Sequence, residues 1–350
     1  MKRNILVLGI SAWLLFGLAF GCMDAVRTEV EQQPLRALII DGQNNHPIWP
    51  KTTMMLKDYL EQTGLFEVDI SRTAYVWQGP HNSGFQDRES RDSLLAAYPL
   101  DGFEYISLDT SRPDPGFAPE FHNYDVVVSN FGWMAAPWPE ATRDSLESYV
   151  ASGGGFVVLH AGSNPFANWY EYNRMTGVGG WGGRDSAAGP YIYYDESGML
   201  QRDVNHGACG AHGTQHDFLI TIRDTTHPIT RGMPPQWLHP KDELYERMCG
   251  PGIDLNVLAT AYSDPEGNAA PWSPGQPASG NHEPQIMTIR YGNGRVFHTT
   301  LGHADYSMEC VGFITAFQRG VEWAATGNVS QKLPDDFPTS TAASTRPWMQ

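Results

Sequence analysis

The sequence contains few cysteines and no cluster of basic residues. Its 4 cysteines are far apart, so it has no Cys-x-x-Cys pair of the kind that forms a zinc knuckle or a redox site. Asp and Glu number 39 against 23 Lys and Arg, the formal net charge is −16, and no run of basic residues follows position 3. Because nucleic-acid binding depends on clustered cations that neutralise phosphates, we predict no nucleic-acid partner.

Common motifs for nucleotide binding and for nucleophilic catalysis are missing from the places where they would act. A P-loop or a G-x-G-x-x-G motif would follow the first predicted strand, but residues 41–44 read DGQN. The strand that ends at His160 is followed by AGS at 161–163, with neither a Cys at the turn nor a G-x-S-x-G motif. Nucleotide binding by these motifs and a Ser or Cys nucleophile are therefore disfavoured.

The N-terminus has the pattern of a targeting segment. Two basic residues precede an apolar run that extends to Phe20 and is followed by Gly21 and Cys22. We predict a lipoprotein-type signal segment over residues 1–22, lipidated at Cys22, and a polar spacer over residues 23–33. This predicts a periplasmic or outer-surface protein that meets the membrane only through its lipid anchor, with ordinary secretion as the alternative.

Three further cysteines, Cys209, Cys249 and Cys310, cannot all pair with one another because their number is odd. One disulfide is typical of an oxidising compartment. Three buried thiols are the alternative. The sequence does not decide between the two.

Apolar strands alternate with amphipathic helices over residues 34–328, which we predict to form one domain. Such alternation is typical of an α/β fold with a mainly parallel sheet and helices on both faces. Strands are expected near residues 35–40, 66–70, 124–128, 155–160, 218–222, 255–261, 286–291 and 295–300, and helices near 51–63, 139–152 and 308–325. We expect loops over 72–120 and a loose tail over 329–350.

Hydrogen-bonding side chains follow several of the predicted strands. In an open parallel sheet, ligands bind outside the carboxyl ends of the strands, where the loops converge. The first strand is followed by Asn44, Asn45 and His46, His160 ends the fourth, and His303 follows the last. A polar ring at the end of an apolar strand must be hydrogen-bonded or face a pocket. His160 and His303 are therefore candidate catalytic residues, and the other three are candidates for substrate binding.

A His and two carboxylates stand close together at His239, Asp242 and Glu243. Such a group suits general acid/base chemistry or a divalent cation such as Zn²⁺. The alternative is a capped helix start, with both carboxylates near the positive end of the helix dipole. We expect the side chains of His46, His160, Glu243 and His303 to meet in a single cavity at one edge of the sheet.

Three more histidines, His206, His212 and His216, are close in sequence. The last two share a face whether the segment is helical or extended, because four residues are close to one helical turn and even in a strand. We consider a metal site such as one for Zn²⁺, pocket-lining histidines and a structural role as open alternatives.

Tryptophans in the predicted loops suit a carbohydrate. A sugar ring presents apolar C–H faces and a polar rim, so flat aromatic rings beside Asn, Asp and His match it, although core packing uses the same rings. The candidate substrate-binding residues of this kind are Trp133, Trp169 and Trp181, together with Arg184 in the same glycine-rich stretch.

At these loops the sequence resembles the ThuA-like (trehalose utilisation) family. The matching pieces are DGQNNH, GGGFVVLHAGSNPFANW, GVGGWGGR, HPIT, HPKDELYERM, GRVFHTTLGH and FQRGVEWAATG, spread from Leu35 to Asn328. The resemblance implies a flavodoxin-like three-layer sandwich, similar to class I glutamine amidotransferases but without their cysteine nucleophile. It also implies a part in the breakdown of trehalose and related disaccharides, often through sugars oxidised at carbon 3.

Two functions follow from these observations. The first is a carbohydrate-active enzyme that acts on a disaccharide, glycoside or 3-keto-glycoside, in which His160 or Glu243 removes a proton beside the keto group. His303, His46 or a cation would polarise the oxygen. The alternative is a non-catalytic sugar-binding lipoprotein, which the density of Trp and the lack of a catalytic triad favour. The sequence leaves open the identity of the sugar and whether the chain forms a homo-oligomer.

Overall fold

The structure is a computed structural model that describes residues 33–80, 91–273 and 277–349. The predicted signal segment with Cys22, and all of the predicted spacer except its last residue, lie outside the described residues. Within the described part of the chain, no helix is both long enough and apolar enough to cross a membrane.

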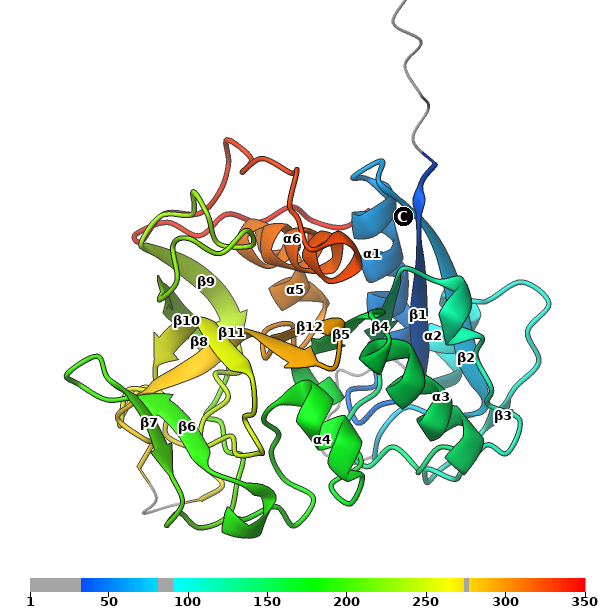
Figure 1. Ribbon diagram of the computed structural model, residues 1–350, viewed down its shortest axis with the longest axis horizontal. Coiled ribbons are helices and arrows are strands. Elements are labelled where there is room, and N and C mark those ends of the chain that lie inside the picture. Colours follow the sequence, from blue (N-terminus) through cyan, green and yellow to red (C-terminus); the bar gives the residue numbers. More distant parts are fainter. Residues whose placement is uncertain (1–32, 81–90, 274–276, 350) are drawn as a thin grey trace, which may run out of the picture. The chain divides into compact units, whose positions relative to one another are not determined.

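In the part of the chain that the structure describes, twelve strands form one sheet, whose arrangement is drawn in Figure 1. They are β1 (Leu35–Gln43), β2 (Phe66–Trp77), β3 (Ile106–Ser107), β4 (Val126–Ser129), β5 (Gly155–Leu159), β6 (Tyr191–Tyr194), β7 (Leu200–Asp203), β8 (His216–Ile222), β9 (Gln236–Asp242), β10 (Leu255–Tyr262), β11 (His282–Tyr291) and β12 (Gly294–Thr299). The order across the sheet is β3-β2-β1-β4-β5-β12-β11-β10-β8-β9, and β6 pairs with β11 and β7 outside this path.

The sheet has a parallel half and an antiparallel half. Neighbouring strands are parallel from β3 to β12 and antiparallel from β12 to β9. The central strands β1, β4 and β5 are apolar on both sides, as expected where helices cover both faces of a sheet. The predicted α/β class is confirmed, and the predicted parallel sheet accounts for one half of a mixed sheet.

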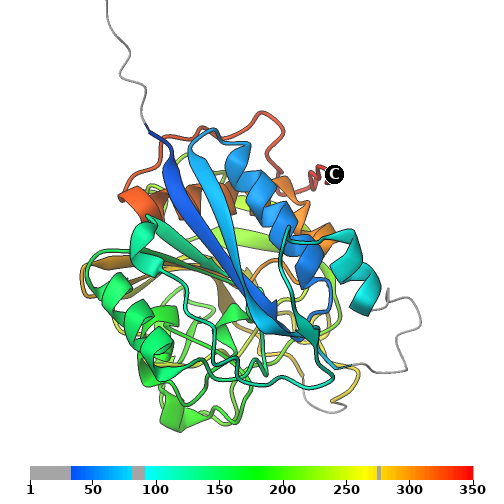
Figure 2. The same ribbon diagram turned by 90° about the vertical axis from the view of Figure 1, so that its right-hand side faces the viewer.

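Helices cover both faces of the parallel half (Figures 1 and 2). On one face lie α1 (Trp49–Glu61) and α6 (Val311–Thr326), and on the other lie α3 (Glu140–Ala151) and α4 (Tyr170–Thr176). The described residues also contain two short α-helices, α2 (Arg91–Ala97) and α5 (Asp305–Met308). Successive strand residues point to opposite faces, so Ile39 packs with α1 and α6 while its neighbour Leu38 packs with α3 and α4.

The structure corrects two predictions of local structure. Strand β2 continues to Trp77 through residues predicted to be loop, and α2 and β3 also lie in that stretch. Its polar second half stays in the sheet because Arg72 forms a buried ion pair with Asp41 of β1, with a distance of 2.7 Å between Nη2 and Oδ2. Residues 236–242 form β9, so the alternative of a helix start there is wrong. Pro240 is compatible with β9 because β9 is an edge strand.

The C-terminal segment, for which the sequence predicts a loose tail, contacts the core. Residues 329–349 contain no helix or regular strand. The Leu238 N–H nevertheless donates to the Thr339 carbonyl at 2.8 Å, and the Trp348 Nε1–H donates to Asp58 Oδ2 at 2.8 Å. Its apolar side chains Leu333, Phe337 and Trp348 also pack against the hydrophobic cluster beneath α6. These anchors in a Pro-, Ser- and Thr-rich segment explain why it follows the surface of the domain.

Cys209 and Cys249 form a disulfide, and Cys310 is a buried free thiol. The disulfide closes a loop with a sequence separation of 40 residues. A cross-link of that length is expected to stabilise the fold by ~4 kcal/mol, chiefly by restricting the unfolded chain. The double variant Cys209→Ser/Cys249→Ser should therefore melt at a clearly lower temperature than the unmodified chain in circular dichroism. Cys310→Ala, which keeps the disulfide, is the control, and equal melting of the double variant and the oxidised unmodified chain would contradict the prediction.

Candidate active site

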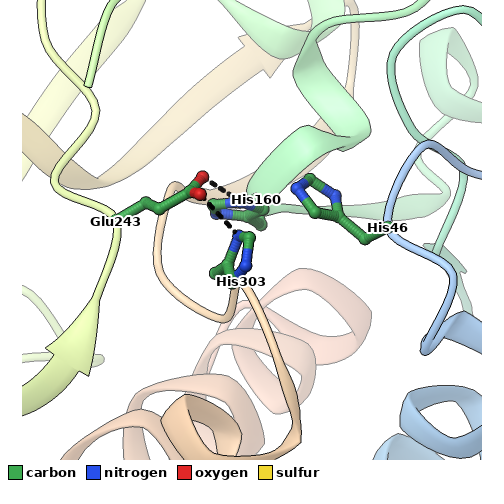
Figure 3. A group of neighbouring side chains, drawn as sticks. All are labelled: His46, His160, Glu243 and His303. Carbon is green, nitrogen blue, oxygen red and sulfur yellow. Dashed lines mark ion pairs between the residues drawn. The ribbon is translucent and has the colours of Figure 1, made fainter. Parts of the chain in front are cut away.

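The segments that follow β1, β5, β9 and β12 meet at one edge of the sheet. The chain reverses its order there, because β1 lies between β2 and β4, and such a switch point is the usual ligand site of an open α/β sheet. His46 follows β1, His160 follows β5, His303 follows β12 and Glu243 follows β9. Figure 3 shows the four side chains pointing toward one another from these four segments. The structure thus brings together the four residues that the sequence places in a single cavity.

Glu243 lies between two of the imidazole rings. Its Oε1 is 3.0 Å from His303 Nδ1, and its Oε2 is 3.5 Å from His160 Nε2. The ring centre of His46 is 4.6 Å from that of His303 and 4.9 Å from that of His160. The four side chains therefore form one compact group, which we call the histidine cluster.

His160 is held in a strained backbone conformation. Its φ is +43°, in the left-handed region that costs a residue with a Cβ about 1–2 kcal/mol. The ring is fixed from both sides, because Nδ1 donates to the Thr300 carbonyl at 2.6 Å and Nε2 accepts from the Tyr245 hydroxyl at 2.8 Å. Strain of this kind persists where the surroundings fix it, and it is common at functional sites.

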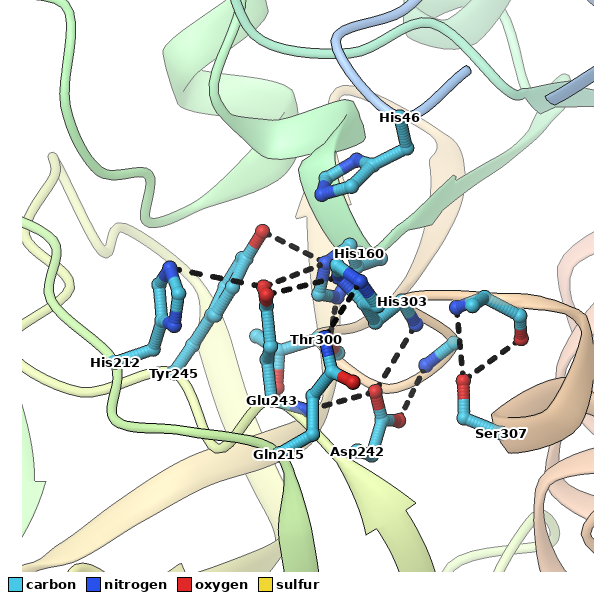
Figure 4. Close-up of polar contacts among 12 residues, drawn as sticks. His46, His160, His212, Gln215, Asp242, Glu243, Tyr245, Thr300, His303 and Ser307 are labelled. Carbon is cyan, nitrogen blue, oxygen red and sulfur yellow. Dashed lines mark hydrogen bonds and ion pairs between the residues drawn. The ribbon is translucent and has the colours of Figure 1, made fainter. Parts of the chain in front are cut away.

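His303 is positioned by a buried carboxylate. Asp242 accepts hydrogen bonds from the backbone N–H groups of Gly302 at 2.7 Å and of His303 at 3.0 Å (Figure 4). The same carboxylate is 2.7 Å from His239 Nε2, and both of these side chains are fully buried. Although burial opposes both charges, the neighbouring Cys310 and Asp242 together raise the pKa of His239, and His239 lowers the pKa of Asp242. Asp242 and His239, predicted as catalytic, therefore support the loop that carries His303 and do not line the pocket.

His46 is held by the loop that carries it. Asn44 Oδ1 accepts from the backbone N–H of His46 at 2.9 Å and lies 3.2 Å from Nδ1 of the ring. This arrangement requires a glycine opposite, because a Cβ at Gly132 would lie 2.1 Å from Asn44 Oδ1 and 2.7 Å from Asn45 Oδ1. The loops after β1 and β4 thus approach each other closely, and the approach directs His46 toward the other rings.

The electrostatics of the cluster favour neutral imidazole at His46 and an ionised Glu243. Burial, together with the rings of His303 and His160, holds the pKa of His46 well below its usual range. Burial would raise the pKa of Glu243, but the facing rings of His303 and His160 outweigh it, so that the pKa lies well below its ordinary value. Burial and the nearby Glu243 hold the pKa of Tyr245 well above 10. The site thus presents one negative charge among polar rings.

The histidine cluster opens into a pocket with a volume of about 230 Å³. The pocket is lined by Asn45, His46, Pro80, Trp133, Asn164, Trp181, His212, Glu243, Tyr245 and His303. A second pocket of about 280 Å³ adjoins it, and the two share Trp181 and His212 as lining residues. Asn44 lies just behind the first pocket, beside His160 and Asn130. Of the residues predicted to bind substrate, Asn45, His46, Trp133 and Trp181 line the pocket.

Trp169 and Arg184, also predicted to bind substrate, lie elsewhere. The Trp169 ring packs in the core against Trp138, 5.6 Å away between ring centres, because its indole N–H reaches Glu147 rather than the pocket. The Arg184 guanidinium is buried and donates to the carbonyls of Asn164 and Pro165, at 2.8 Å in each case. Arg184 therefore shapes the loop that presents Asn164 to the pocket.

The structure separates the three histidines that the sequence groups as metal ligands. His206 Nε2 is 2.9 Å from the Gly189 carbonyl. His216 begins β8, and its Nδ1 is 2.8 Å from the Thr214 carbonyl. His212 lines the pocket instead, with Nε2 3.8 Å from Glu243 Oε2. Among the described residues, the ligand atoms of these three form no group within 4.8 Å, whereas those of the histidine cluster do. Among the residues that the structure describes, His46, His160, His303 and Glu243 form a group that could hold a metal.

Several pocket residues were not singled out from the sequence. Tyr245 contacts His160, Gln215 Nε2 lies 2.9 Å from His303 Nε2, and Trp272 lines the second pocket. Tyr245 offered a signal, since it stands two residues after Glu243 in an extended segment and so shares its side of the chain. Gln215 and Trp272 come from loops with no periodic pattern, and no feature of the sequence places them here.

Comparisons with known proteins bear on the whole domain. A family model described as ThuA, trehalose utilisation, matches residues 36–324. A solved structure from Parabacteroides merdae ATCC 43184, described as a ThuA-like protein, is 39% identical, with a TM-score of 0.74, and the match covers 90% of this chain and 98% of that one. A second, from Bacteroides uniformis ATCC 8492 and also described as ThuA-like, is 16% identical, with a TM-score of 0.50 and coverage of 85% and 94%, and shows a likeness of fold alone. No curated protein matches the chain.

Proposed function

Because this chain belongs to the ThuA family, whose model is described as trehalose utilisation, we propose that it is a carbohydrate-active enzyme. Its substrate in this proposal is a disaccharide, a glycoside or a 3-keto-glycoside, and its chemistry is proton transfer by His and carboxylate groups. The class I glutamine amidotransferase-like, three-layer form of the fold belongs to the same proposal.

The observation that carries the proposal is the meeting of the histidine cluster with tryptophan in one pocket. Glu243 and three imidazoles line or adjoin a cavity whose walls include Trp133 and Trp181. Concave sites with a few convergent polar groups and shifted pKa values are the usual place of catalysis. Aromatic walls beside Asn45 and Asn164 suit the apolar faces and the polar rim of a sugar.

The adjoining pocket supports a substrate with two rings. Trp181 and His212 line both pockets, and Trp272 lines the second one, with its ring centre 5.2 Å from that of His212. Together the two pockets fall in the range of roughly 300–1,000 Å³ that is typical of small-molecule sites. We assign the ring that reacts to the pocket of the histidine cluster and the second ring to the pocket of Trp272.

The contacts also suggest which group takes the proton. Removal of a proton beside a keto group needs a base that presents a lone pair, and groups that stabilise the negative oxygen that forms. His160 Nε2 is engaged by Tyr245, and Glu243 stands between two rings. His212 donates from Nδ1 to the Gly213 carbonyl at 2.8 Å, so its Nε2 carries the lone pair. We assign His212 as the base, and His303 and Tyr245 to the side of the negative oxygen, with His160 holding the Tyr245 hydroxyl in place.

The alternative function is a non-catalytic sugar-binding lipoprotein that captures a sugar for a partner enzyme. The tryptophans in and beside the pocket support this alternative equally well. Lipidation at Cys22 and a periplasmic or outer-surface location belong to both proposals and rest on the sequence of the N-terminal segment.

A substrate panel tests the proposal. The purified chain should convert at least one disaccharide, glycoside or 3-keto-glycoside to a product of different mass or retention time in liquid chromatography with mass spectrometry. Calorimetric binding of a sugar without any product would support the binding lipoprotein and refute the enzyme. If the chain neither binds nor converts any sugar of the panel, both proposals are refuted.

A further inference from the structure

We propose that His46, His160, His303 and Glu243 bind a divalent transition-metal ion, with Zn²⁺ as its representative. Each residue offers one nitrogen or oxygen, and these four atoms lie within 4.8 Å of one another. Three imidazoles and one carboxylate form a donor set that suits Zn²⁺ and its neighbours in the first transition row, whereas Mg²⁺ and Ca²⁺ prefer oxygen alone. This inference adds a cofactor to the site of the proposed function and does not depend on which sugar reacts.

Two distances from Glu243 within the histidine cluster are close to those between ligands of one ion. Bonds of about 2.0–2.2 Å to nitrogen and oxygen place tetrahedral ligand atoms roughly 3.3–3.6 Å apart. Glu243 already lies 3.0 Å from His303 Nδ1 and 3.5 Å from His160 Nε2. His46 approaches from the opposite side in Figure 3, so the four donors surround a common point rather than lie in a row.

The far side of each ring is held by a polar partner. His160 Nδ1 donates to the Thr300 carbonyl and His46 Nδ1 faces Asn44 Oδ1, which places the lone pair of both rings on Nε2. The Tyr245 hydroxyl donates to His160 Nε2 in the structure, so it must turn away for an ion to take that lone pair. Histidines that bind metals usually donate their other N–H to a carbonyl or carboxylate in this way, because the bond fixes the tautomer and the ring orientation.

Gln215 completes the pattern at His303. Its amide lies 2.9 Å from Nε2 of the ring, so the nitrogen that faces Glu243 is Nδ1. The amide oxygen and nitrogen exchange places by a half-turn of the side chain, and the oxygen then accepts from Nε2–H. The Tyr306 hydroxyl, which donates to the amide oxygen in the structure, would then accept from the amide N–H instead. The lone pair of Nδ1 thereby becomes available to the ion.

Charge and burial favour a cation at this point. The Glu243 side chain is only 9% exposed, and an ionised carboxylate at such depth requires a compensating positive charge. The three rings and the carboxylate surround one point, with ring centres 4.6–5.4 Å apart, and a divalent cation bound there would offset the charge of the carboxylate. In the proposed reaction such an ion polarises the oxygen of the substrate.

The second group of possible ligands in the described residues does not compete. It consists of His206, Cys209 and Cys249, whose ligand atoms also lie within 4.8 Å of one another. The two cysteines are joined in a disulfide, which leaves no thiolate to bind a metal.

Metal titration tests the inference without reference to turnover. The full chain, prepared without a histidine tag and dialysed against a chelator, should bind one Zn²⁺ per chain in isothermal titration calorimetry with ZnCl₂. The zinc content of the chain after gel filtration, measured by mass spectrometry of the metal, should also be one Zn²⁺ per chain. His46→Ala and Glu243→Gln should each weaken the affinity by at least about 10²-fold, because each removes one ligand from the set. Co²⁺ bound in place of Zn²⁺ should show visible absorption bands that neither variant reproduces.

His216→Ala is the matched control, because it removes a histidine that lies outside the histidine cluster. Its affinity for Zn²⁺ should equal that of the unmodified chain. Circular dichroism establishes that the variants are folded, and the nearly isosteric Glu243→Gln decides the matter if His46→Ala does not fold. The absence of stoichiometric Zn²⁺ binding, or equal affinity in both ligand variants and the unmodified chain, would overturn the inference. Stoichiometric Zn²⁺ without any sugar product would uphold the inference and refute the enzyme. Sugar product from a chain that binds no stoichiometric Zn²⁺ would refute the inference and uphold the enzyme.

Discussion

The double variant His160→Asn/His303→Gln is expected to lose at least about 10³-fold in kcat/KM toward the sugar that the unmodified chain converts. Both rings contact Glu243, His303 stands on the side assigned to the negative oxygen, and His160 holds the Tyr245 hydroxyl on that side. Groups that are preorganised around a developing charge contribute more than any other single effect in most enzymes, because they are already oriented before the reaction begins. When two such groups are lost from one buried site, catalysis depends only on substrate binding and on the remaining residues of the site.

The substitutions are chosen to preserve the backbone. Position 160 has a φ of +43°, which Asn tolerates better than most residues, and Gln at 303 keeps a polar group of similar reach. His206→Asn/His216→Gln makes the same two changes at histidines outside the pocket and serves as the matched control. Initial rates by mass spectrometry, with circular dichroism to verify folding, measure the effect. Unchanged turnover in a folded His160/His303 variant, with a normal rate in the control, would remove these rings from the mechanism.

The parallel half of the sheet and the residues at its strand ends follow from simple patterns. Runs such as 37–40 and 156–159 are apolar on both faces, and their ends must lie at one edge because the strands are parallel. His46 and His160 could therefore be placed together without knowledge of any contact. His303 follows the same rule, since β12 is the last strand that runs parallel to β5.

The antiparallel half was harder to predict, and the site residues that it carries explain the gaps. Strand β9 contains Pro240 and charged residues, so its sequence does not show a clear alternation of apolar and polar residues. Its pairing with β8 also contains a register shift. The neighbours of Glu243 depend on that pairing. Gln215 precedes β8 and reaches His303 only because β8 and β9 are paired, which no local pattern reveals.

Two further errors arose from chemistry that is local in space but not in sequence. Trp169 and Trp181 are equivalent in a reading based on composition, yet one ring packs in the core beside Trp138 and the other lines the pocket. The disulfide could not be chosen from three cysteines, because the pairing of Cys209 with Cys249 depends on the loops that carry them. Composition indicates which residues are available, whereas the topology of the chain decides which of them meet.

Asp242→Asn is expected to lower the free energy of unfolding by about 3–5 kcal/mol, because it leaves a buried cation at His239 without its partner. Both side chains are fully buried, and their nitrogen and oxygen are 2.7 Å apart. Asp69→Asn is the control, since Asp69 forms an exposed ion pair with Arg36 whose loss should cost less than about 1 kcal/mol. Urea denaturation followed by circular dichroism measures both, and a similar small loss in the two variants would show that the buried pair is not charged.

The same residue should also affect turnover separately from stability. Asp242 accepts from the backbone N–H groups of Gly302 and His303, so its amide variant retains only one acceptor for two donors. In His239→Leu/Asp242→Asn the unpaired charge is gone, so much of the lost stability should return. Turnover should remain low in this double variant at a temperature where it is fully folded, because the loop that carries His303 is still held by a single bond. Recovery of both stability and turnover would mean that Asp242 acts only as the partner of His239 and does not position His303.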